Sequence, residues 1–341
     1  MNNGIDFLMN NACPSIRFRV LKEILNMSFD SDEMVYFQGQ ILQDEAVKAI
    51  LDKQQPNGWI GREFHGDDGV ETYIRLLHEK GVNTENKAFL KALNSIRGED
   101  TSFADSFLRV GRILDEKCLG GSYLLRAVLF AYVGMENEGF VQEQIQNSLS
   151  AFRSVLNICS FDEIADKYKD KLVFKPGVRF PCIYDLRLLA FTHTWRTDET
   201  LSMVSASINR LVELSPIPYI HVKEKSQLIA PAAVFMNDFK IELDELNDKS
   251  WFVWLHLAEL ISRLGVIKSL PHWSDQVDTL ADMLERDNGK FIKPLKHYYF
   301  TKWSPYTGLA LENSWRNPSN RICDLTFRSL LILKYAERLI I

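Results

Sequence analysis

The chain has 341 residues, of which 46% are hydrophobic and 25% are charged, a composition that is ordinary for a globular protein with a large core. Its net charge of -5 gives no electrostatic reason to expect nucleic acid or an anionic membrane surface as a partner. The five cysteines are far apart and form no CxxC pair, which favours free thiols over a disulfide framework or a cysteine-rich zinc site.

The first residues of the chain lack the basic and then apolar order of a signal peptide. No run of the sequence approaches the roughly 18 apolar residues that a membrane span needs. Together with the free thiols, these features lead us to expect a cytoplasmic protein.

Helical spacing of apolar residues begins close to the N-terminus. Pro14 suits the first position of a helix, and a longer helix is expected from about residue 33 to residue 53. Asp67 or Asp68 is placed to cap the helix that follows, because a side-chain carboxylate can accept the free N–H groups of a first turn. This part of the chain is therefore predicted to be a series of helices joined by short turns.

Two stretches share one order, in which an Asn-Gly turn follows a helix and leads to an aromatic residue and then Ile. They are residues 54–61 (QQPNGWIG) and 286–292 (RDNGKFI). Asn and Gly tolerate a positive φ, so the chain can stop a helix and reverse there. Trp59 and Phe291 follow the reversal, where a large aromatic can wedge between neighbouring helix pairs. The alternative is two ordinary turns beside core aromatics, but the shared order favours a helical repeat.

Further helices are expected over residues 103–114 and 140–156. Two other segments, 122–130 and 181–189, are apolar on most sides, which indicates inner, buried helices. Residues 226–239 fit either a buried helix or irregular structure. No segment is a convincing strand, so the sequence predicts an all-α protein.

The C-terminal part contains an aromatic-rich insertion over residues 293–320, before a last helix over residues 324–338. The insertion carries the aromatic residues Tyr298, Tyr299, Phe300, Trp303, Tyr306 and Trp315. Long ordered loops are often functional, although some only cover a core. No linker or composition shift divides the chain, so residues 1–341 are expected to form a single domain of stacked helix pairs.

Residues 54–59, 286–291 and 14–21 carry a resemblance to the α/α-toroid superfamily, the fold of protein prenyltransferase β subunits and squalene-type terpenoid cyclases. Those proteins repeat an outer helix, a Gln/Gly/Trp-rich corner and an inner helix. Residues 54–59 resemble a shortened corner, 286–291 resemble a degenerate copy, and 14–21 resemble the start of small bacterial members. The resemblance implies an α/α toroid of about five to six stacked helix pairs around a central cavity.

In terpenoid cyclases of the protonating type an Asp-x-Asp-Asp motif supplies the acid, and residues 65–68 (HGDD) resemble it most closely here. The resemblance implies Asp67 and Asp68 as candidate proton donors, although His stands in the first place of the motif. Paired carboxylates can raise the pKa of one member, which then keeps a proton to donate. The alternative is that one of the two acids only caps a helix.

Protein prenyltransferases bind zinc through Asp, Cys and His, and Cys323 and Asp324 lie at the start of the last helix, where such ligands could occur. The Asp-x-Cys spacing of that family is absent, and no His follows Cys323. The nearest is His297, upstream. No cofactor is therefore expected, with zinc or magnesium kept as alternatives.

In a toroid the N-termini of the inner helices line the cavity, which would place residues 184–187 and 321–328 there. The candidate acids are Asp67, Asp68, Asp185 and Asp324, and the candidate ligand-binding residues are Tyr184, Arg187, Tyr299, Trp303, Tyr306, Trp315, Arg321 and Arg328. The arginines could pair with a ligand carboxylate or phosphate in a bidentate way. Alternatively, Asp185 and Asp324 are caps, and the arginines satisfy neighbouring carboxylates or carbonyls.

The resemblance implies a prenyltransferase- or terpenoid-cyclase-like toroid that binds a small apolar or isoprenoid ligand, with a transferase or cyclase reaction left open. Aromatic side chains of the insertion would line the pocket and stabilise a carbocation through their π faces. Two alternatives are a non-catalytic protein-binding scaffold and a carbohydrate-active toroid. The lining of the cavity distinguishes an isoprenoid from a carbohydrate ligand. Apolar and aromatic walls favour an isoprenoid, and open carboxylate pairs beside aromatics favour a sugar. A small molecule is thus the expected partner, and the sequence names no protein partner.

Overall fold

The computed structural model describes residues 2–98, 106–243 and 246–339. Over these residues the chain is mostly helical, as predicted, with 14 α-helices and one small β-sheet. None of the described helices is long and apolar enough to cross a membrane. The chain divides into two compact units, each with contacts of its own. The single domain over residues 1–341 stays a prediction, and each unit is described by itself.

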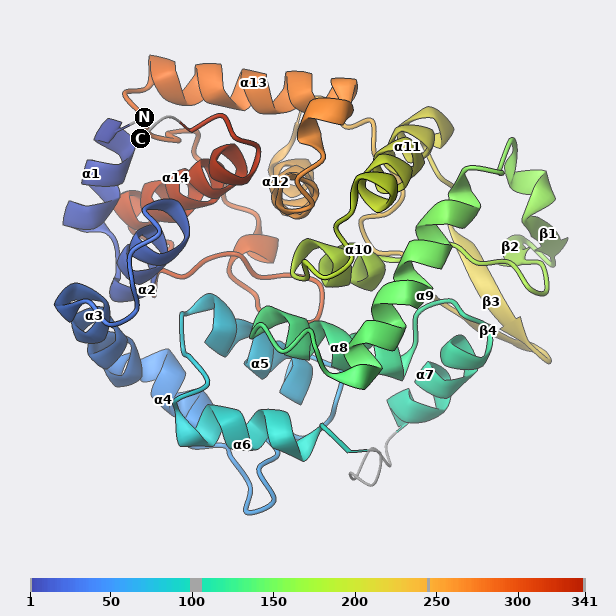
Figure 1. Cartoon of the computed structure of the whole chain (residues 1–341), viewed down its shortest axis with the longest axis horizontal. Helices are drawn as coiled ribbons and strands as arrows, with labels where there is room; N and C mark the ends of the chain where they lie inside the picture. The colour runs from blue at the N-terminus through green and yellow to red at the C-terminus, as the bar shows by residue number, and fades with distance from the viewer. Residues whose placement is uncertain (1, 99–105, 244–245, 340–341) are drawn as a thin grey trace. The chain divides into compact units, whose positions relative to one another are not determined.

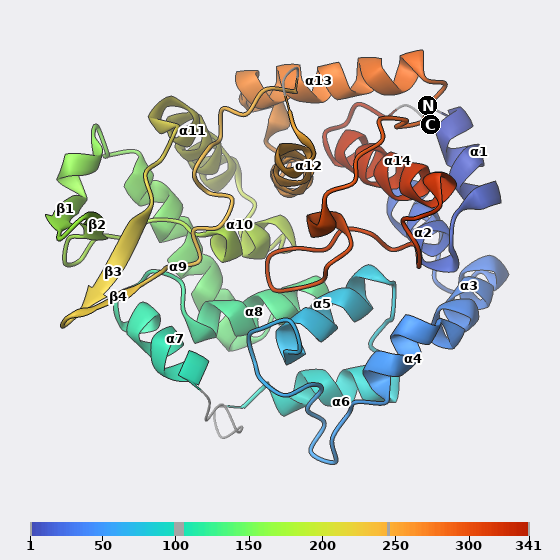
Figure 2. The same ribbon diagram turned by 180° about the vertical axis from the view of Figure 1, so that it is seen from behind.

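Unit 1 consists of Met1–Glu99, Glu242–Arg263 and Trp273–Ile341, so it joins both ends of the chain. Its elements are α1 (Asn2–Asn11), α2 (Pro14–Arg19), the π-helix η1 (Val20–Ile24), α3 (Asp32–Gln43), α4 (Glu45–Leu51), α5 (Val70–Glu79), α6 (Lys87–Ser95), α12 (Asp248–Arg263), most of α13 (Pro271–Arg286), the 3-10 helix η5 (Tyr298–Phe300) and α14 (Pro318–Tyr335). The last helix, α14, packs against α12, α1 and η1, as Figures 1 and 2 show from opposite sides. The C-terminal helix is therefore the core of unit 1.

The core of unit 1 is formed by aromatic and aliphatic side chains that the helical spacing already brings together. Trp251 and Trp254 of α12 are 1% and 0% exposed, and their ring centroids lie 5.9 Å apart. From α14, Leu325, Phe327 and Leu330 are equally buried. Both tryptophans therefore belong to the core of unit 1.

Two helix boundaries differ from the sequence prediction. Pro14 is the first residue of α2, as expected. The helix predicted over residues 33–53 is instead two helices, because Asp44 accepts the N–H groups of Ala46 and Val47 and so starts α4 as a new helix. Asp67 and Asp68 do not cap α5, whose N-cap is Gly69 without a side-chain hydrogen bond.

The first Asn-Gly corner has the backbone that its residues predict. Gly58 has a φ of 97°, and a Cβ atom there would lie 2.6 Å from the Lys91 carbonyl oxygen. Gln54 Nε2 donates to the carbonyls of Gly58 at 2.9 Å and of Ala88 at 2.7 Å, which ties the corner to α6. Trp59 is 6% exposed, so the aromatic residue is buried as expected.

The second corner repeats these features with other partners. Asn288 and Gly289 both have a positive φ, at 57° and 79°. Phe291 is 2% exposed, and its ring lies 5.2 Å from that of Trp251. Its N–H donates to Thr326 Oγ1 of α14 at 2.9 Å. The predicted reversals and buried aromatics are thus present at both corners, while a complete helical repeat stays a prediction.

Unit 2 consists of Asp100–Ile241 and Leu264–His272. Its elements are α7 (Ser106–Glu116), α8 (Ser122–Tyr132), α9 (Gly139–Val155), the 3-10 helix η2 (Phe161–Glu163), β1 (Ala165–Tyr168), β2 (Lys171–Phe174), α10 (Ile183–Ala190), α11 (Asp198–Leu214), β3 (Ile220–Glu224), β4 (Gln227–Ile229) and the 3-10 helix η4 (Ile267–Ser269). Helix α9 packs against α8, α10 and α11 (Figure 1). Of the predicted helix over 103–114, residues 103–105 lie outside the described residues.

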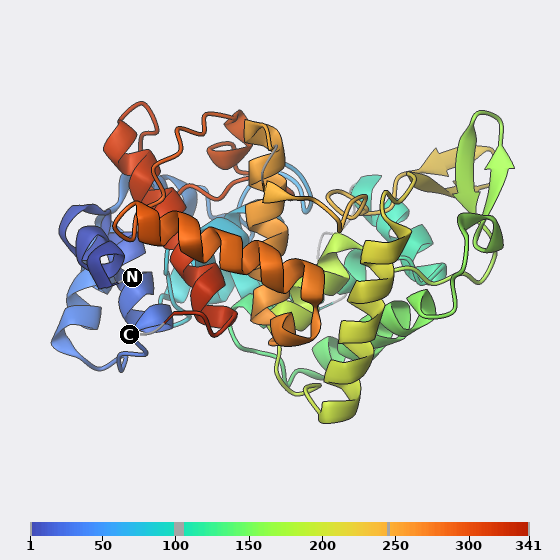
Figure 3. The same cartoon turned by 90° about the horizontal axis from the view of Figure 1, so that it is seen from above.

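A four-stranded sheet in unit 2 corrects the prediction that the chain has no strand. The strands lie in the order β1-β2-β3-β4, with β2 and β3 parallel and the other pairs antiparallel. Figure 3 shows strands of this sheet as green and yellow arrows. Lys169 and Lys225 have φ values of 56° and 54°, so each forms the tight turn of a hairpin. Strands of three to five residues are too short for their alternation to stand out in the sequence.

Candidate functional site

The residues predicted as sites are divided between the two units. Tyr184, Asp185 and Arg187 lie in the first turns of α10 in unit 2, and the other predicted residues lie in unit 1.

Asp67 and Asp68 lie in the turn before α5 and are held by ion pairs at the surface. Lys302 Nζ lies 2.7 Å from Oδ2 of Asp67, and Lys53 Nζ lies 3.0 Å from Oδ1 of Asp68. Hydrogen bonds from Tyr73 and Lys53 lower the pKa of Asp68. A proton donor at neutral pH needs a raised pKa. The pKa of Asp68 is thus shifted away from that of a proton donor, and the catalytic role of the pair stays a prediction.

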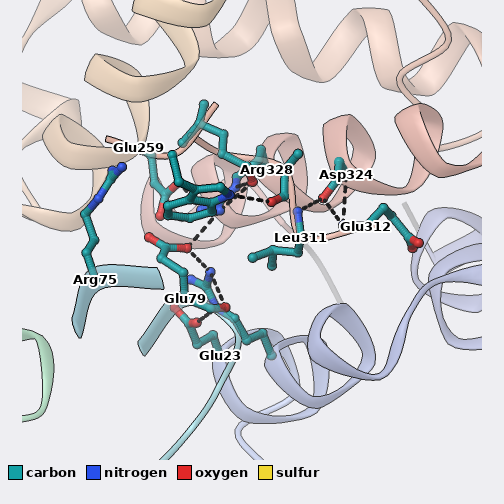
Figure 4. A network of polar contacts seen from close by, with 12 residues as sticks. Glu23, Arg75, Glu79, Glu259, Leu311, Glu312, Asp324 and Arg328 are labelled. Carbon is teal, nitrogen blue, oxygen red and sulfur yellow. Dashed lines mark hydrogen bonds and ion pairs between the residues drawn. The ribbon is translucent and has the colours of Figure 1, made fainter. Parts of the chain in front are cut away.

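Asp324 and Arg328 lie one turn apart on α14 and hold the end of the aromatic-rich insertion (Figure 4). Oδ1 of Asp324 accepts a hydrogen bond from the Leu311 N–H at 2.6 Å, and Arg328 Nη2 donates to the Leu309 carbonyl at 2.7 Å. Burial raises the pKa of Asp324 to about 7. Both side chains are 1% exposed, so their contacts are those of anchors between α14 and the main chain of the insertion.

Arg328 also belongs to a closed ring of three arginines and three glutamates in the core of unit 1. Around the ring the residues are Glu23, Arg19, Glu79, Arg328, Glu259 and Arg263, which returns to Glu23. Arg328 lies 2.8 Å from Glu79 and 3.1 Å from Glu259, and the side chains of the ring are only 2–13% exposed. Figure 4 shows part of the ring, which ties α2, η1, α5, α12 and α14 together.

The arginines of the ring lower the pKa of two of its glutamates although these are buried. Burial raises the pKa of Glu79, but the charges of Arg328 and Arg19 outweigh this effect and hold the pKa below its ordinary value. The same balance lowers the pKa of Glu23, which faces Arg19 and Arg263. Because each glutamate faces two arginines, the ring is a structural core and not a proton-donating site.

The predicted tryptophans of the insertion pack within unit 1. The Arg75 guanidinium lies 4.8 Å from the ring centroid of Trp303 and donates to the Ser304 carbonyl at 2.8 Å. Trp315 stacks on Phe300 with centroids 4.9 Å apart, and its Nε1 donates to Oδ2 of Asp324 at 2.6 Å.

The remaining predicted residues of the insertion also make local contacts. Tyr299 contacts Phe252 with ring centroids 5.5 Å apart, and Tyr306 contacts His65 at the same distance. Arg321 donates to the carbonyl of Trp315. These contacts explain how the insertion is held, and a ligand-binding role for its residues stays a prediction.

Cys323 and His297, the residues considered for zinc, both lie in unit 1. Cys323 is buried, and burial raises the pKa of its thiol to about 12. His297 Nδ1 accepts the N–H of Tyr299 at 3.3 Å. Among residues 2–98, 106–243 and 246–339, no group of three or more His, Cys, Asp or Glu side chains could hold a metal ion.

Asp185, the predicted acid of unit 2, is buried at the start of α10. Its Oδ1 accepts a hydrogen bond from Ser148 Oγ at 2.7 Å, and its Oδ2 accepts the N–H of Cys182 at 2.8 Å. Asp185 therefore completes a capping box for α10, as the alternative interpretation expected. Burial raises its pKa. The neighbouring Arg187 guanidinium lies 5.1 Å from the ring centroid of Tyr184.

Asp185 also lines a cleft of about 480 Å³ that lies wholly within unit 2 and opens to solvent. The end of α7 and parts of α8, α9 and α10 form its walls. Its charged and polar side chains belong to Arg112, Asp115, Glu116, Tyr123, Glu143, Gln144, Asn147, Arg179 and Asp185. Four carboxyl groups face two guanidinium groups in this lining, and Tyr123 adds an aromatic ring that is 42% exposed. We name it the acidic cleft.

Asp115 of the acidic cleft is the functional candidate that sequence reasoning missed. It lies at the end of α7, and its carboxylate accepts the N–H groups of Ser122 at 3.0 Å and Tyr123 at 3.4 Å. It thereby caps α8 from the preceding helix. Burial nevertheless raises the pKa of Asp115 to about 7, so roughly half of the molecules carry a proton there at neutral pH.

Two glycines allow Asp115 to reach the start of α8. Gly120 has a φ of 74°, and a Cβ atom there would lie 2.6 Å from Cys182 Sγ. A Cβ atom on Gly121 would lie 2.4 Å from Oδ1 of Asp115. The available signal was an Asp near the end of a predicted helix before a Gly-Gly pair. Helical spacing alone does not show that this carboxylate reaches into the next helix.

Comparisons with models of known protein families, with curated proteins and with solved structures find no match to this chain. The resemblance to α/α toroids therefore stays a prediction that rests on the corners and the helices. The acidic cleft is the stronger candidate for a functional site, because burial raises the pKa of its residues Asp115 and Asp185. In the ring of unit 1, by contrast, every glutamate is paired with two arginines.

Proposed function

We propose that this protein binds a saccharide in the acidic cleft. The observation that carries the proposal is the lining, in which the carboxyl groups of Asp115 and Asp185 are combined with the exposed ring of Tyr123. Saccharides present many hydroxyl groups, which donate to carboxylates and accept from guanidinium and amide N–H groups. Their apolar ring faces pack on aromatic side chains. Such a lining disfavours an isoprenoid, which offers no hydroxyl groups to its charged and polar side chains.

The volume of the acidic cleft supports a small saccharide. A cleft of about 480 Å³ lies within the usual range of small-molecule sites, which is roughly 300–1,000 Å³. Arg112 and Arg179 supply donors, while the amides of Gln144 and Asn147 supply both donors and acceptors. A neutral ligand with many hydroxyl groups can satisfy donors and acceptors of this mixture at the same time.

The raised pKa of Asp115 adds a chemical possibility to binding. A carboxyl group that is protonated at neutral pH can donate its proton to a glycosidic oxygen, and glycoside hydrolysis uses such an acid with a second carboxylate. Asp185 supplies another carboxyl group of the same cleft. Hydrolysis of a glycosidic bond would release new reducing ends from the saccharide, so these are measured together with binding.

The test is a glycan array followed by calorimetric titration with the full chain. We expect at least one saccharide class to bind, and Asp115→Asn and Tyr123→Ala to weaken that binding by about tenfold or more. Asp198→Asn is the matched control, because Asp198 lies exposed at the start of α11 and outside the acidic cleft. Absence of any bound saccharide, or unchanged affinity in both cleft variants with retained helicity, would overturn the proposal.

The α/α toroid and its isoprenoid ligand also remain proposals. They are supported by the two Asn-Gly corners, each with a positive φ at its Gly and a buried aromatic residue after it. Thermal-shift measurements with prenyl diphosphates test the isoprenoid alternative directly. Stabilisation by a prenyl diphosphate, unaffected by Asp115→Asn, would favour that alternative over the saccharide.

A further inference from the structure

A second cavity of unit 2 adjoins the acidic cleft and has the opposite charge. Its volume is about 900 Å³, and it shares Glu116, Cys118 and Arg179 with the acidic cleft. The end of α7, the β1–β2 hairpin and part of β3 form its wall. The two cavities therefore adjoin at the three shared residues. We name the second cavity the basic groove.

The charges of the basic groove are mainly lysines. Lys117, Lys167, Lys175, Arg179 and Lys223 line it, against the carboxylates of Glu116 and Asp166. Lys167 and Lys223 are exposed, and Lys223 Nζ lies 4.1 Å from the ring centroid of Tyr168. The groove therefore presents an excess of positive charge beside an aromatic ring.

Part of this positive charge is not neutralised by the protein. Lys117 Nζ pairs with Glu224 at 3.0 Å, and Lys175 Nζ donates to the carbonyl of Asp162 at 2.5 Å. By contrast, within the part of the chain that the structure describes, the side chains of Lys167, Arg179 and Lys223 form no ion pair with a carboxylate. Cations that line a cavity without internal partners are available to an anionic ligand.

We propose that the basic groove binds the anionic part of the same saccharide, through carboxylate or sulfate groups on its sugar units. This inference rests on the proposed function of the acidic cleft. The sugar units in the acidic cleft present hydroxyl groups to Asp115 and Asp185, and the units in the basic groove present negative charges to Lys167, Arg179 and Lys223. A nucleic acid fits this arrangement less well, because its phosphates would continue into a cleft lined by four carboxyl groups.

The test compares a neutral cello-oligosaccharide with the same oligosaccharide that carries carboxylates on the two sugar units at one end only, with the full chain at low and high salt. We expect the end-carboxylated oligosaccharide to bind about tenfold or more tightly at low salt, with an advantage that shrinks as salt is added. The double variant Lys167→Gln/Lys223→Gln is expected to remove this advantage.

The same hairpin offers a matched control for that double variant. Lys169→Gln/Lys171→Gln makes the same charge change on exposed residues that do not line the groove, so the advantage of the anionic sugar should persist. If neutral sugars bind and no carboxylated or sulfated oligosaccharide gains affinity, the basic groove proposal is wrong while the acidic cleft proposal stands. If neither kind of sugar binds, the proposed function itself fails. Equal affinity for a single-stranded oligonucleotide of the same charge would also overturn the saccharide assignment.

Discussion

The charged ring of unit 1 and the acidic cleft of unit 2 place similar side chains in opposite electrostatic situations. In the ring, each of three glutamates faces two arginines, and the pKa values of Glu23 and Glu79 are lowered despite burial. In the acidic cleft, burial raises the pKa of Asp115 to about 7 and also raises that of Asp185. The number of cationic partners, and not burial alone, therefore decides the direction of each shift.

Asp324 sharpens this comparison because it lies in unit 1 but behaves like the acids of the cleft. Its carboxylate accepts N–H groups of Leu311 and Trp315, and burial raises its pKa to about 7. It lines neither the acidic cleft nor the basic groove, however. A raised pKa thus marks a buried acid without a cation, and only an adjoining cavity makes such an acid available to a ligand.

The largest effect is expected from a substitution that breaks the ring of unit 1. Arg328→Met removes the partner that Glu79 and Glu259 share and leaves buried carboxylates with one cation each. We expect a loss of about 3–5 kcal/mol in the free energy of unfolding, measured by urea denaturation. Arg338→Met is the control, since its pair with Asp278 is more exposed and is worth about 0–1 kcal/mol. Equal losses in the two variants would show that the ring does not act as a unit.

A second substitution tests the lowered pKa of Glu79 in the ring. Glu79→Gln is expected to cost about 2–4 kcal/mol at pH 7, because Arg19 and Arg328 keep their charges and lose a shared carboxylate. The folded pKa of Glu79 lies below its unfolded value, so its stabilisation is present above about pH 4.5 and is lost as the pH falls through the folded pKa. The stabilities of the two proteins should therefore differ most at pH 7 and become steadily more similar as the pH falls below about 4.5. A difference independent of pH contradicts the electrostatic explanation.

A third substitution disturbs the geometry of the acidic cleft. A methyl group on Gly121 would lie 2.0 Å from the Gly111 carbonyl and 2.4 Å from Oδ1 of Asp115, so Gly121→Ala should displace α7 from the start of α8. We expect a cost of about 1–3 kcal/mol, measured by thermal denaturation, together with loss of saccharide binding. Gly139→Ala is the control, because nothing lies within 4 Å of its added methyl group. Unaltered stability of Gly121→Ala would show that the close approach is not required.

The smallest expected effect is a pH dependence of unit 2. The folded pKa of Asp115 is about 7, above its unfolded value of about 3.8, so the folded state holds the proton more tightly. Stability should therefore fall as the pH rises from about 4 to about 7 and change little on either side of this window. Asp115→Asn should reduce that fall by about 1–2 kcal/mol, and Asp324→Asn provides the comparison with a buried acid outside the cleft. A saccharide ligand should shift the apparent pKa of Asp115 and leave that of Asp324 unchanged.

Local sequence determined the features that depend on one or two residues. Pro14 starts α2 because its fixed φ suits a first turn, and Gly58 and Gly289 reverse the chain because they tolerate a positive φ. The spacing of Trp251 and Trp254 placed both in the core. The mainly helical composition was readable for the same reason, since apolar spacing over long segments is a local property.

Some signals were present in the sequence but ambiguous. Arg19 and Glu23, Glu259 and Arg263, and Asp324 and Arg328 are each four residues apart. Opposite charges at this spacing share a helix face, which is also true of ordinary exposed pairs. The closure of two such pairs with Glu79 and Arg328 into one ring depends on which helices meet, and no local pattern contains that information.

Only the tertiary structure decided where the acids lie and what surrounds them. Asp44 starts a new helix inside a periodic segment, and the strands of unit 2 are stabilised by pairing between segments far apart in sequence. The acidic cleft exists because Asp115 reaches from α7 to α8 and Asp185 faces the same space from α10. A pKa shift is the sum of burial and neighbouring charges, and both are set by residues that folding brings together across the chain.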